Sequence, residues 1–306
     1  MRAQLENLVR RAASRDGFII VAVLWILAAL ATLASIMAVY VINAATGLTV
    51  HDERLQSETL MRAAIELSVY RAVTGQQQGM LSRGSFAVRL GNANVAADFT
   101  AETARIDLNT APRELLSGLF VGLGTPRNAA DGHADQIIAW RAPPAQGGPD
   151  PASYYRTAGL PYSPRGAPFQ HVAELGLVLG IPEGAVERAT PFVTVYSGQP
   201  QVNILDAAPQ VLAALPGMNP ERLHTLLAQR QARPQNAQVL LATLGPAQAL
   251  ATTQGNKALR VTARITFDSG QRMTTEAVIF MLDSGAEPYR VLTWRDDADD
   301  TRAEAR

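Results

Sequence analysis

The sequence contains no cysteine and little else that a metal enzyme or a covalent enzyme requires. Its 306 residues include four histidines, none of them in an HExxH or other paired-ligand spacing. The absence of cysteine excludes disulfides, thiolate nucleophiles and cysteine zinc sites. The pair Gly122-Leu123-Gly124 lacks the lysine of a phosphate-binding loop. We therefore expect no enzymatic activity and assign no catalytic or cofactor-binding residue.

Net charge is absent as well. The 27 basic and 27 acidic residues balance, and Lys257 is the only lysine. A net charge of zero argues against a strongly basic nucleic-acid-binding protein and against a long acidic tail. The chain is 47% hydrophobic and 18% charged, a balance typical of globular proteins.

The strongest feature that is present is a long apolar run near the N-terminus. Residues 17–50 carry no charged side chain, and the apolar core is Phe18–Ile42. As a helix rising about 1.5 Å per residue, this core would be roughly 37 Å long, enough to cross a hydrocarbon layer of about 30 Å. The charged residues before it are Arg2, Glu6, Arg10, Arg11, Arg15 and Asp16. This basic excess predicts a cytoplasmic N-terminus, with the rest of the chain on the other side of the membrane.

A cleaved secretory signal peptide is the alternative interpretation. Ala29-Leu30-Ala31 offers a small-x-small cleavage site. The apolar run continues well beyond that site, however, and is longer than the usual apolar region of a signal peptide. A retained anchor is therefore the favoured interpretation.

The segment Ser14-Arg15-Asp16-Gly17-Phe18-Ile19-Ile20 supports a more specific interpretation. It resembles the prepilin processing site of type IV pilins and type II secretion pseudopilins. The resemblance implies that prepilin peptidase cleaves between Gly17 and Phe18 and that Phe18 is then N-methylated. Ala22 stands where most members of these families carry a glutamate, which is thought to meet the terminal amine of a neighbouring subunit. A subunit without that carboxylate can still offer its own amine, so the departure favours a subunit that starts or caps a filament.

The helix is predicted to continue beyond the membrane. No proline interrupts residues 43–74, and Gly75 follows as a C-cap. The apolar stripe recurs at four-residue spacing, at Met61, Ile65, Val69 and Val73. We expect this half of the helix to pack on its own domain and the membrane half to contact other subunits.

Two regions of alternating apolar and polar residues, 85–102 and 259–282, predict β-hairpins, and residues 289–294 predict a short last strand. A hairpin alone is marginally stable, so both hairpins are expected in one antiparallel sheet that packs on the helix. The predicted fold class is α+β: a long N-terminal transmembrane and amphipathic helix packed on an antiparallel sheet, with a large inserted all-α domain. The expected segments are a leader at 1–17, the transmembrane helix at 18–42, the helix continuation and first hairpin at 43–104, the insertion at 105–254, the second hairpin at 255–295 and a disordered tail at 296–306.

The expected insertion contains a short sequence motif that occurs twice. Leu108-Asn109-Thr110-Ala111-Pro112 matches Leu205-Asp206-Ala207-Ala208-Pro209 in form. In each copy, a strand-like apolar stretch comes first. A predicted helix-capping residue follows it, and then a proline in the predicted first helical turn. The expected caps are Asn109 or Thr110 in the first copy and Asp206 in the second. Residues 142–167 are rich in proline and glycine and predict a long loop.

The second copy supports an alternative function. Residues 202–230, with Leu215-Pro216-Gly217-Met218, resemble a helix-hairpin-helix of DNA-uptake proteins, which would make the chain a membrane-anchored DNA-binding protein. The turn lacks a second glycine, and the next helix offers Arg222 and His224 but no basic cluster. Phosphate recognition depends on several cations. We therefore expect no nucleic-acid partner. A secreted enzyme with a signal peptide is the third hypothesis, and no visible active-site pattern supports it.

The whole arrangement resembles minor pseudopilin K of type II secretion. It combines a prepilin site lacking the glutamate, a split sheet and an inserted helical domain that carries Asp107-Leu108-Asn109-Thr110-Ala111-Pro112. The resemblance implies a single-pass protein of the cell inner membrane, with most of the chain in the periplasm. It also implies a complex with minor pseudopilins I and J at the tip of the pseudopilus, beside the major pseudopilin.

The same resemblance raises the question of calcium, which family members often bind near an acidic motif. The corresponding stretch here, Ala139–Pro144, retains Trp140 but lacks the aspartates, and only Asp150 remains near Tyr154-Tyr155. Calcium needs six to eight oxygen ligands, usually including several carboxylates. No cofactor is therefore expected. Asp131 and Asp135 are further carboxylates, for which solvation on a helix surface is the simpler explanation.

Overall fold

The computed structural model describes residues 2–74, 81–143, 150–231, 237–283 and 287–297; within the first helix, side chains are described at 19–41 and from 56 onward. The chain divides into two compact units, residues 1–59 and 60–306. The predicted cap Gly75 and residues 298–306 of the predicted tail lie outside the described residues.

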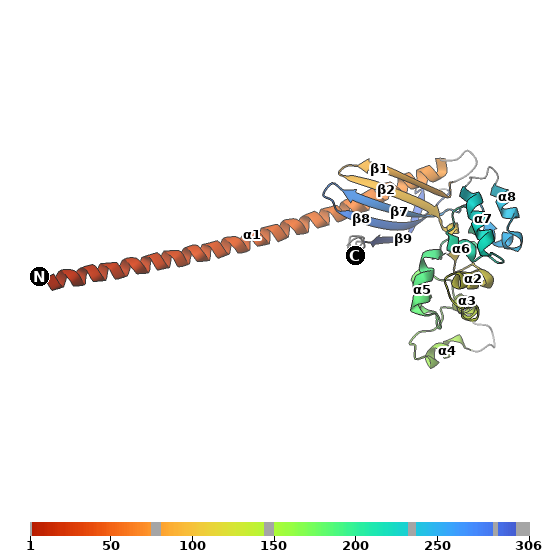
Figure 1. Ribbon diagram of the computed structural model, residues 1–306, viewed down its shortest axis with the longest axis horizontal. Helices are drawn as coiled ribbons and strands as arrows, with labels where there is room; N and C mark the ends of the chain where they lie inside the picture. Colours follow the sequence, from red (N-terminus) through yellow and green to blue (C-terminus); the bar gives the residue numbers. More distant parts are fainter. Residues whose placement is uncertain (1, 75–80, 144–149, 232–236, 284–286, 298–306) are drawn as a thin grey trace. The chain divides into compact units, whose positions relative to one another are not determined.

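Helix α1 (Arg2–Thr74) includes the apolar run and its predicted continuation (Figure 1). No proline occurs within it, so every backbone amide after the first turn can join the helical hydrogen-bond ladder. Two hydroxyl groups in the apolar run are satisfied by the helix itself. Thr32 Oγ1 donates to Ala28 O at 2.8 Å, and Ser35 Oγ donates to Ala31 O at 2.9 Å. The hydroxyl groups of Thr32 and Ser35 are therefore satisfied even in an apolar surrounding.

The second unit contains a five-stranded antiparallel sheet with strand order β1-β2-β7-β8-β9 (Figure 1). The strands are β1 (Arg83–Leu90), β2 (Ala93–Ala101), β7 (Ala258–Phe267), β8 (Arg272–Met281) and β9 (Tyr289–Asp297). Both predicted hairpins are present and pair with each other through β2 and β7. The β1–β2 turn consists of Gly91 and Asn92, with Gly91 at a φ of 57° that L-residues rarely adopt. The α+β fold class is thereby confirmed.

One face of this sheet packs on the C-terminal part of α1. The shared core contains Met61, Ala64, Ile65, Val69 and Ala72 of the helix and the alternating inward residues Val95, Ala97, Phe99, Val261, Ala263 and Ile265 of the strands. Val73, predicted to belong to the buried stripe, is 59% exposed, whereas Ala72 is buried. Four residues turn a helix by about 400°, so repeated four-residue steps drift off the buried face, and a three-residue step from Val69 returns to it.

Strand β9 is longer than predicted. It ends at Asp297 rather than at Trp294, and Arg295 lies opposite Glu276 on β8. Residues 296 and 297 therefore belong to the sheet, not to a tail. Their charged composition was misleading because an edge strand tolerates polar and charged side chains.

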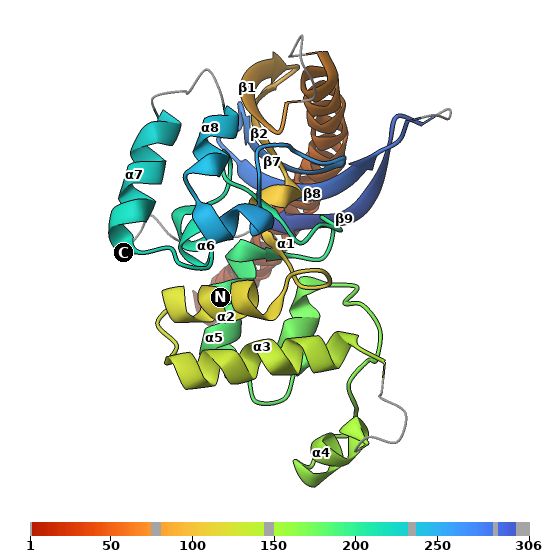
Figure 2. The ribbon, with the colours of Figure 1, turned by 90° about the vertical axis from the view of Figure 1, so that its right-hand side faces the viewer.

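The insertion between β2 and β7 is mostly helical. Its α-helices are α2 (Arg113–Gly122), α3 (Arg127–Arg141), α4 (Pro151–Thr157), α5 (Glu183–Ala189), α6 (Pro209–Ala213), α7 (Pro220–Gln231) and α8 (Ala237–Ala242). Its 3-10 helices are η1 (Glu102–Ala104), η2 (Val172–Leu177), η3 (Thr190–Phe192) and η4 (Gly245–Leu250). Helices α2 and α3 lie side by side (Figure 2). Helix α4 lies within the predicted loop, where Asp150 caps the helix and Pro151 occupies its first turn, two local signals that favour helix formation.

The insertion is not purely α-helical, because two short parallel strand pairs hold it together. Strand β3 (Ile106–Asp107) pairs with β4 (Val193–Thr194), and β5 (Val202–Asn203) pairs with β6 (Ala251–Thr252). Each pair joins the beginning of one half of the insertion to its end. The two halves, residues 106–198 and 202–254, are called here the first and second repeats.

The repeats have the same turn, in a register one residue different from the predicted one. Asp107 Oδ1 accepts from Asn109 N at 2.7 Å, and Asn203 Oδ1 accepts from Leu205 N at 3.0 Å. Asp107 therefore corresponds to Asn203, and Leu108 corresponds to Ile204 rather than to Leu205. The predicted caps are wrong, since the N-cap residues are Pro112 and Ala208, with no side-chain cap bond.

Arginines at the ends of α3 and α7 strengthen the correspondence between the repeats. Arg141 donates to the carbonyl oxygens of Leu108 and Ala111. Arg230 donates to the equivalent oxygens, at 2.6 Å for Ala207 and 3.4 Å for Ile204. A guanidinium group has several donors in a fixed plane, so one arginine can donate hydrogen bonds to two carbonyl oxygens of the same turn.

Candidate functional site

The first candidate site is the apolar segment of α1. Ile19–Val41 is the one segment, among the described residues, that is long and apolar enough to span a membrane. Its large side chains, including Trp25, Ile36 and Tyr40, are exposed. An isolated helix with apolar side chains on all faces fits a single-pass membrane anchor.

The predicted processing residues lie at the start of this segment. The bond between Gly17 and Phe18 is within α1, and the side chain of Phe18 lies outside the described ones. Ala22 is half-buried by its helical neighbours and presents a methyl group where the pilin families have a carboxylate. The nearest acidic residue that follows in sequence is Asp52, about 45 Å along the helix by its rise.

A second candidate is the turn of the first repeat, at the motif beginning with Asp107. The Asp107 carboxylate is buried and accepts from Gly198 N at 2.8 Å in addition to Asn109 N. Burial raises the pKa of this carboxyl, and the backbone donors oppose that rise. Asn109 donates to Phe169 O at 3.0 Å and accepts from Phe169 N at 2.7 Å. The motif therefore joins three distant segments, and its polar groups are used internally.

The segment that corresponds to the family's calcium region is built around aromatic rings. Trp140 stacks on Phe169 at a centroid distance of 6.1 Å and lies at the same distance from Tyr155. Asp150 accepts from Ala152 N at 3.0 Å and pairs with Arg156 at 2.8 Å. The hydrogen bond from Arg156 holds the pKa of Asp150 below its usual range.

The two spare carboxylates on α3 are also engaged. Arg113 Nη2 donates to Asp135 Oδ2 at 3.0 Å, and Ser117 donates to Asp131. Within the described ranges, no three or more carboxylate or histidine side chains gather closely enough to hold a metal ion. The arrangement gives no support for a calcium site in that part of the chain.

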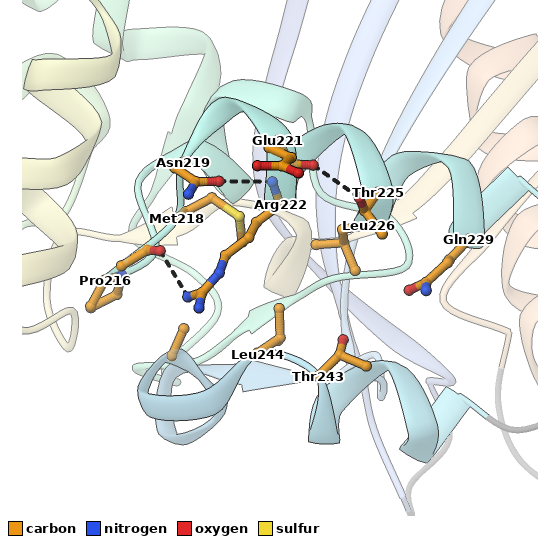
Figure 3. A pocket seen from close by; sticks show the side chains of 12 residues that line it. Pro216, Met218, Asn219, Glu221, Arg222, Thr225, Leu226, Gln229, Thr243 and Leu244 are labelled. Carbon is orange, nitrogen blue, oxygen red and sulfur yellow. Dashed lines mark hydrogen bonds between the residues drawn. The ribbon is translucent and has the colours of Figure 1, made fainter.

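The helix-hairpin-helix-like turn of the second repeat lines a cavity of about 370 Å³ (Figure 3). Gly217 adopts a φ of 71° in the turn, and Asn219 accepts from Arg222 N at 2.8 Å at the start of α7. The Arg222 guanidinium turns back to Gly217 O, at 3.2 Å, as the dashed line in Figure 3 shows. The cavity lining holds one cation, Arg222, and one carboxylate, Glu221. A lining with one cation and one carboxylate gives no support for phosphate binding, which depends on several cations.

A buried ionic cluster that sequence reasoning missed lies where the insertion leaves the sheet. Glu102 on η1 is fully buried and accepts from Arg260 on β7 at 2.8 and 3.1 Å. Thr194 of β4 also donates to Glu102, and Arg260 pairs with Glu276 on β8. The cluster ties the first repeat to the sheet. The only sequence signal is that Glu102 and Arg260 are charged residues within predicted strands.

The fold and the apolar helix define a class of protein. An apolar single-span helix, whose continuation packs on an antiparallel sheet, has the architecture of a pseudopilin. A likeness to a solved structure supports this fold. A chain in the crystal structure of the GspK-GspI-GspJ complex from the type 2 secretion system of enterotoxigenic Escherichia coli matches with a TM-score of 0.56 and 16% sequence identity. The match covers 81% of this chain and 98% of the other.

The particular family is indicated by the sequence. Residues 92–198 match the family model described as type II secretion system (T2SS), protein K. This range runs from β2 through the first repeat and ends at Gly198, whose amide binds Asp107. The comparison with curated proteins finds no match. The family model and the solved structure together confirm the predicted resemblance to minor pseudopilin K of type II secretion.

Proposed function

We propose that this protein acts at the tip of the type II secretion pseudopilus, where it initiates or caps assembly and supports protein export across the outer membrane. The observation that carries the proposal is Ala22. A subunit within a filament needs a carboxylate in its apolar segment to meet a neighbouring amine, because an unpaired buried charge is costly. A subunit with alanine there can donate its own N-terminus and cannot receive another.

Minor pseudopilins I and J are the proposed partners, on the support of the likeness to the GspK-GspI-GspJ complex. The major pseudopilin, prepilin peptidase and the inner membrane are the further partners proposed. The basic residues before the apolar run support a cytoplasmic N-terminus and a periplasmic second unit. No nucleic-acid partner is proposed.

Processing is tested by Gly17→Glu in cells that contain prepilin peptidase. We expect the wild-type protein to begin at an N-methylated Phe18 and the variant to keep its leader, because the narrow cleavage site accepts a backbone without a side chain. Mass spectrometry of the intact protein measures both. Gly47→Ala, within the same helix but distant from the bond, is the control. A start near Thr32, or normal cleavage of Gly17→Glu, would refute the proposed processing.

The position at the tip is tested by stoichiometry. In filaments made longer by additional major pseudopilin, a tip subunit should become a smaller fraction of the purified pseudopili. Quantitative mass spectrometry measures the ratio of this protein to the major pseudopilin. A ratio that stays constant as the filaments lengthen would indicate a subunit that repeats along them.

A further inference from the structure

A cavity of about 350 Å³ lies where the beginning of β1, the end of η1 and the turn of the second repeat come together. Four arginines line it, against two carboxylates. The arginines are Arg83, Arg105, Arg230 and Arg260, and the carboxylates are Asp98 and Asp206. The lining therefore has a formal charge of two positive units, on a chain whose net charge is zero.

Arg83 begins the sheet and Arg105 begins the insertion. Carboxylates act on both only at a distance, Asp206 on Arg83 and Glu102 with Glu276 on Arg105. Arg260 is neutralised by Glu102, and Asp98 pairs with Arg264 at 2.7 Å. No ion pair joins Arg83 or Arg105 to a carboxylate in the described part of the chain. Arg105 Nη1 donates to the carbonyl oxygen of Pro191 at 2.6 Å, and this single bond leaves most of its donors for a ligand.

Like charges face one another across this cavity. Burial lowers the pKa of Arg230, and the neighbouring Arg83 lowers it further, while the Asp206 carboxylate opposes the shift. Burial also lowers the pKa of Arg105, and the Arg260 guanidinium contributes, while the Glu102 and Glu276 carboxylates oppose the shift. A negatively charged ligand would add to this partial compensation, and it would form charge-assisted hydrogen bonds with planar donors that suit a carboxylate.

We propose that this cavity, called here the arginine pocket, binds carboxylate side chains from an acidic segment of a partner protein. Arg83 and Asp98 are exposed, so the pocket opens to solvent and a side chain can enter. The lining also includes apolar side chains that can contact the methylene groups of a glutamate, from Phe192, Pro209 and Val211. The pocket belongs wholly to the second unit, so the proposal does not depend on a position at the pseudopilus tip.

The test uses the full-length protein in neutral detergent and a dye-labelled hexaglutamate peptide as the probe. Fluorescence anisotropy measures binding. We expect binding that weakens as salt rises, and a loss of about fivefold in affinity in Arg83→Ala, since one exposed charge contact contributes modestly. Arg105→Gln should weaken binding at least as much. Arg89→Ala is the matched control, because Arg89 lies on the same strand, pairs with Asp268 and is not part of the pocket lining.

Three results would overturn the proposal. The first is no binding at low salt, and the second is an equal loss in Arg89→Ala, which would indicate attraction to any cation on the surface. The third is displacement of the peptide by inorganic phosphate more effectively than by chloride of the same ionic strength, which would assign the pocket to phosphate. Arg83 is exposed at the start of an edge strand, so Arg83→Ala should fold normally even if Arg105→Gln loosens the contact with Pro191.

Discussion

Gly118 lies where α2 crosses α6, and replacing it with alanine provides a sharp test of the packing between the two repeats. A Cβ atom at this position would stand 2.2 Å from Ala214 O and 3.0 Å from Ala214 C. Carbon and oxygen atoms in contact need roughly 3.2–3.4 Å, so the helices would have to separate by about 1 Å. The atom in the way belongs to the backbone and cannot rotate aside.

The magnitude follows from two opposing effects. Overpacking of a well-packed core costs typically 1–3 kcal/mol, and a backbone obstacle favours the upper end of that range. Alanine in place of glycine within a helix returns about 1 kcal/mol. The net expectation for Gly118→Ala is a free energy of unfolding lower by about 2 kcal/mol, which corresponds to about a 30-fold rise in the population of the open state.

Gly122→Ala is the matched control, on the same helix and four residues away. Its Cβ would meet only the Cβ of Ala213, at 4.0 Å, which is ordinary contact. This variant should gain about 0.5 kcal/mol from helix propensity alone. The two variants therefore make the same chemical change with opposite expected signs.

Hydrogen exchange of the full-length protein in detergent, read by mass spectrometry, measures the effect locally. Peptides from α2 and α6 should exchange faster in Gly118→Ala and slightly more slowly in Gly122→Ala, while peptides from β7 and β8 stay unchanged. If Gly118→Ala exchanges no faster than Gly122→Ala, the close approach of α2 to Ala214 is refuted.

Two further predictions concern buried polar groups. Glu102→Gln should lower the free energy of unfolding by about 3 kcal/mol, because it leaves the Arg260 guanidinium with one carboxylate and a mismatched donor; urea denaturation measures this, and a loss below about 1 kcal/mol would contradict it. His133 is buried in a T-shaped contact with the Phe120 ring, and burial holds its pKa below the ordinary value of 6.5. The folded state therefore binds fewer protons than the unfolded state, so stability should fall as the pH decreases through 6.5 toward the folded-state pKa. His133→Leu should lose less stability than the wild type between pH 7.5 and 5, roughly the range over which histidine titrates, and an equal loss would contradict this account.

The sheet and its helix could be predicted because the spacing of apolar residues in their sequences follows which side chains are buried. Strand β2 has one buried face, so the buried residues Val95, Ala97 and Phe99 alternate along it with the exposed residues Asn94, Ala96 and Asp98. Helix α1 has no proline and an apolar stripe that differs from the true buried face only at its last member, Val73. The likeness to pseudopilin K rests on these same patterns and on the motif at Asp107.

The insertion was less predictable because its structure depends on distant pairs. The register of the repeat is set by parallel pairing of Ile106 with Val193 and of Val202 with Ala251, which no local pattern specifies. The contact between Glu102 and Arg260 joins residues 158 positions apart. The proposed processing at Gly17 and Phe18 depends on a separate peptidase. It therefore does not follow from the fold of this chain and stays a prediction.

The insertion leaves the sheet after Ala101 and returns by Leu259, and these two residues are partners in the β2–β7 ladder. Its two ends are therefore held one strand spacing apart, about 5 Å, however long the intervening chain is. Because the entropic cost of closing a loop grows slowly with its length, the stability of the sheet depends little on the length of the inserted chain. A lineage could therefore exchange, enlarge or duplicate this module while keeping the scaffold below it, and a foreign domain with neighbouring termini could be grafted at the same junction.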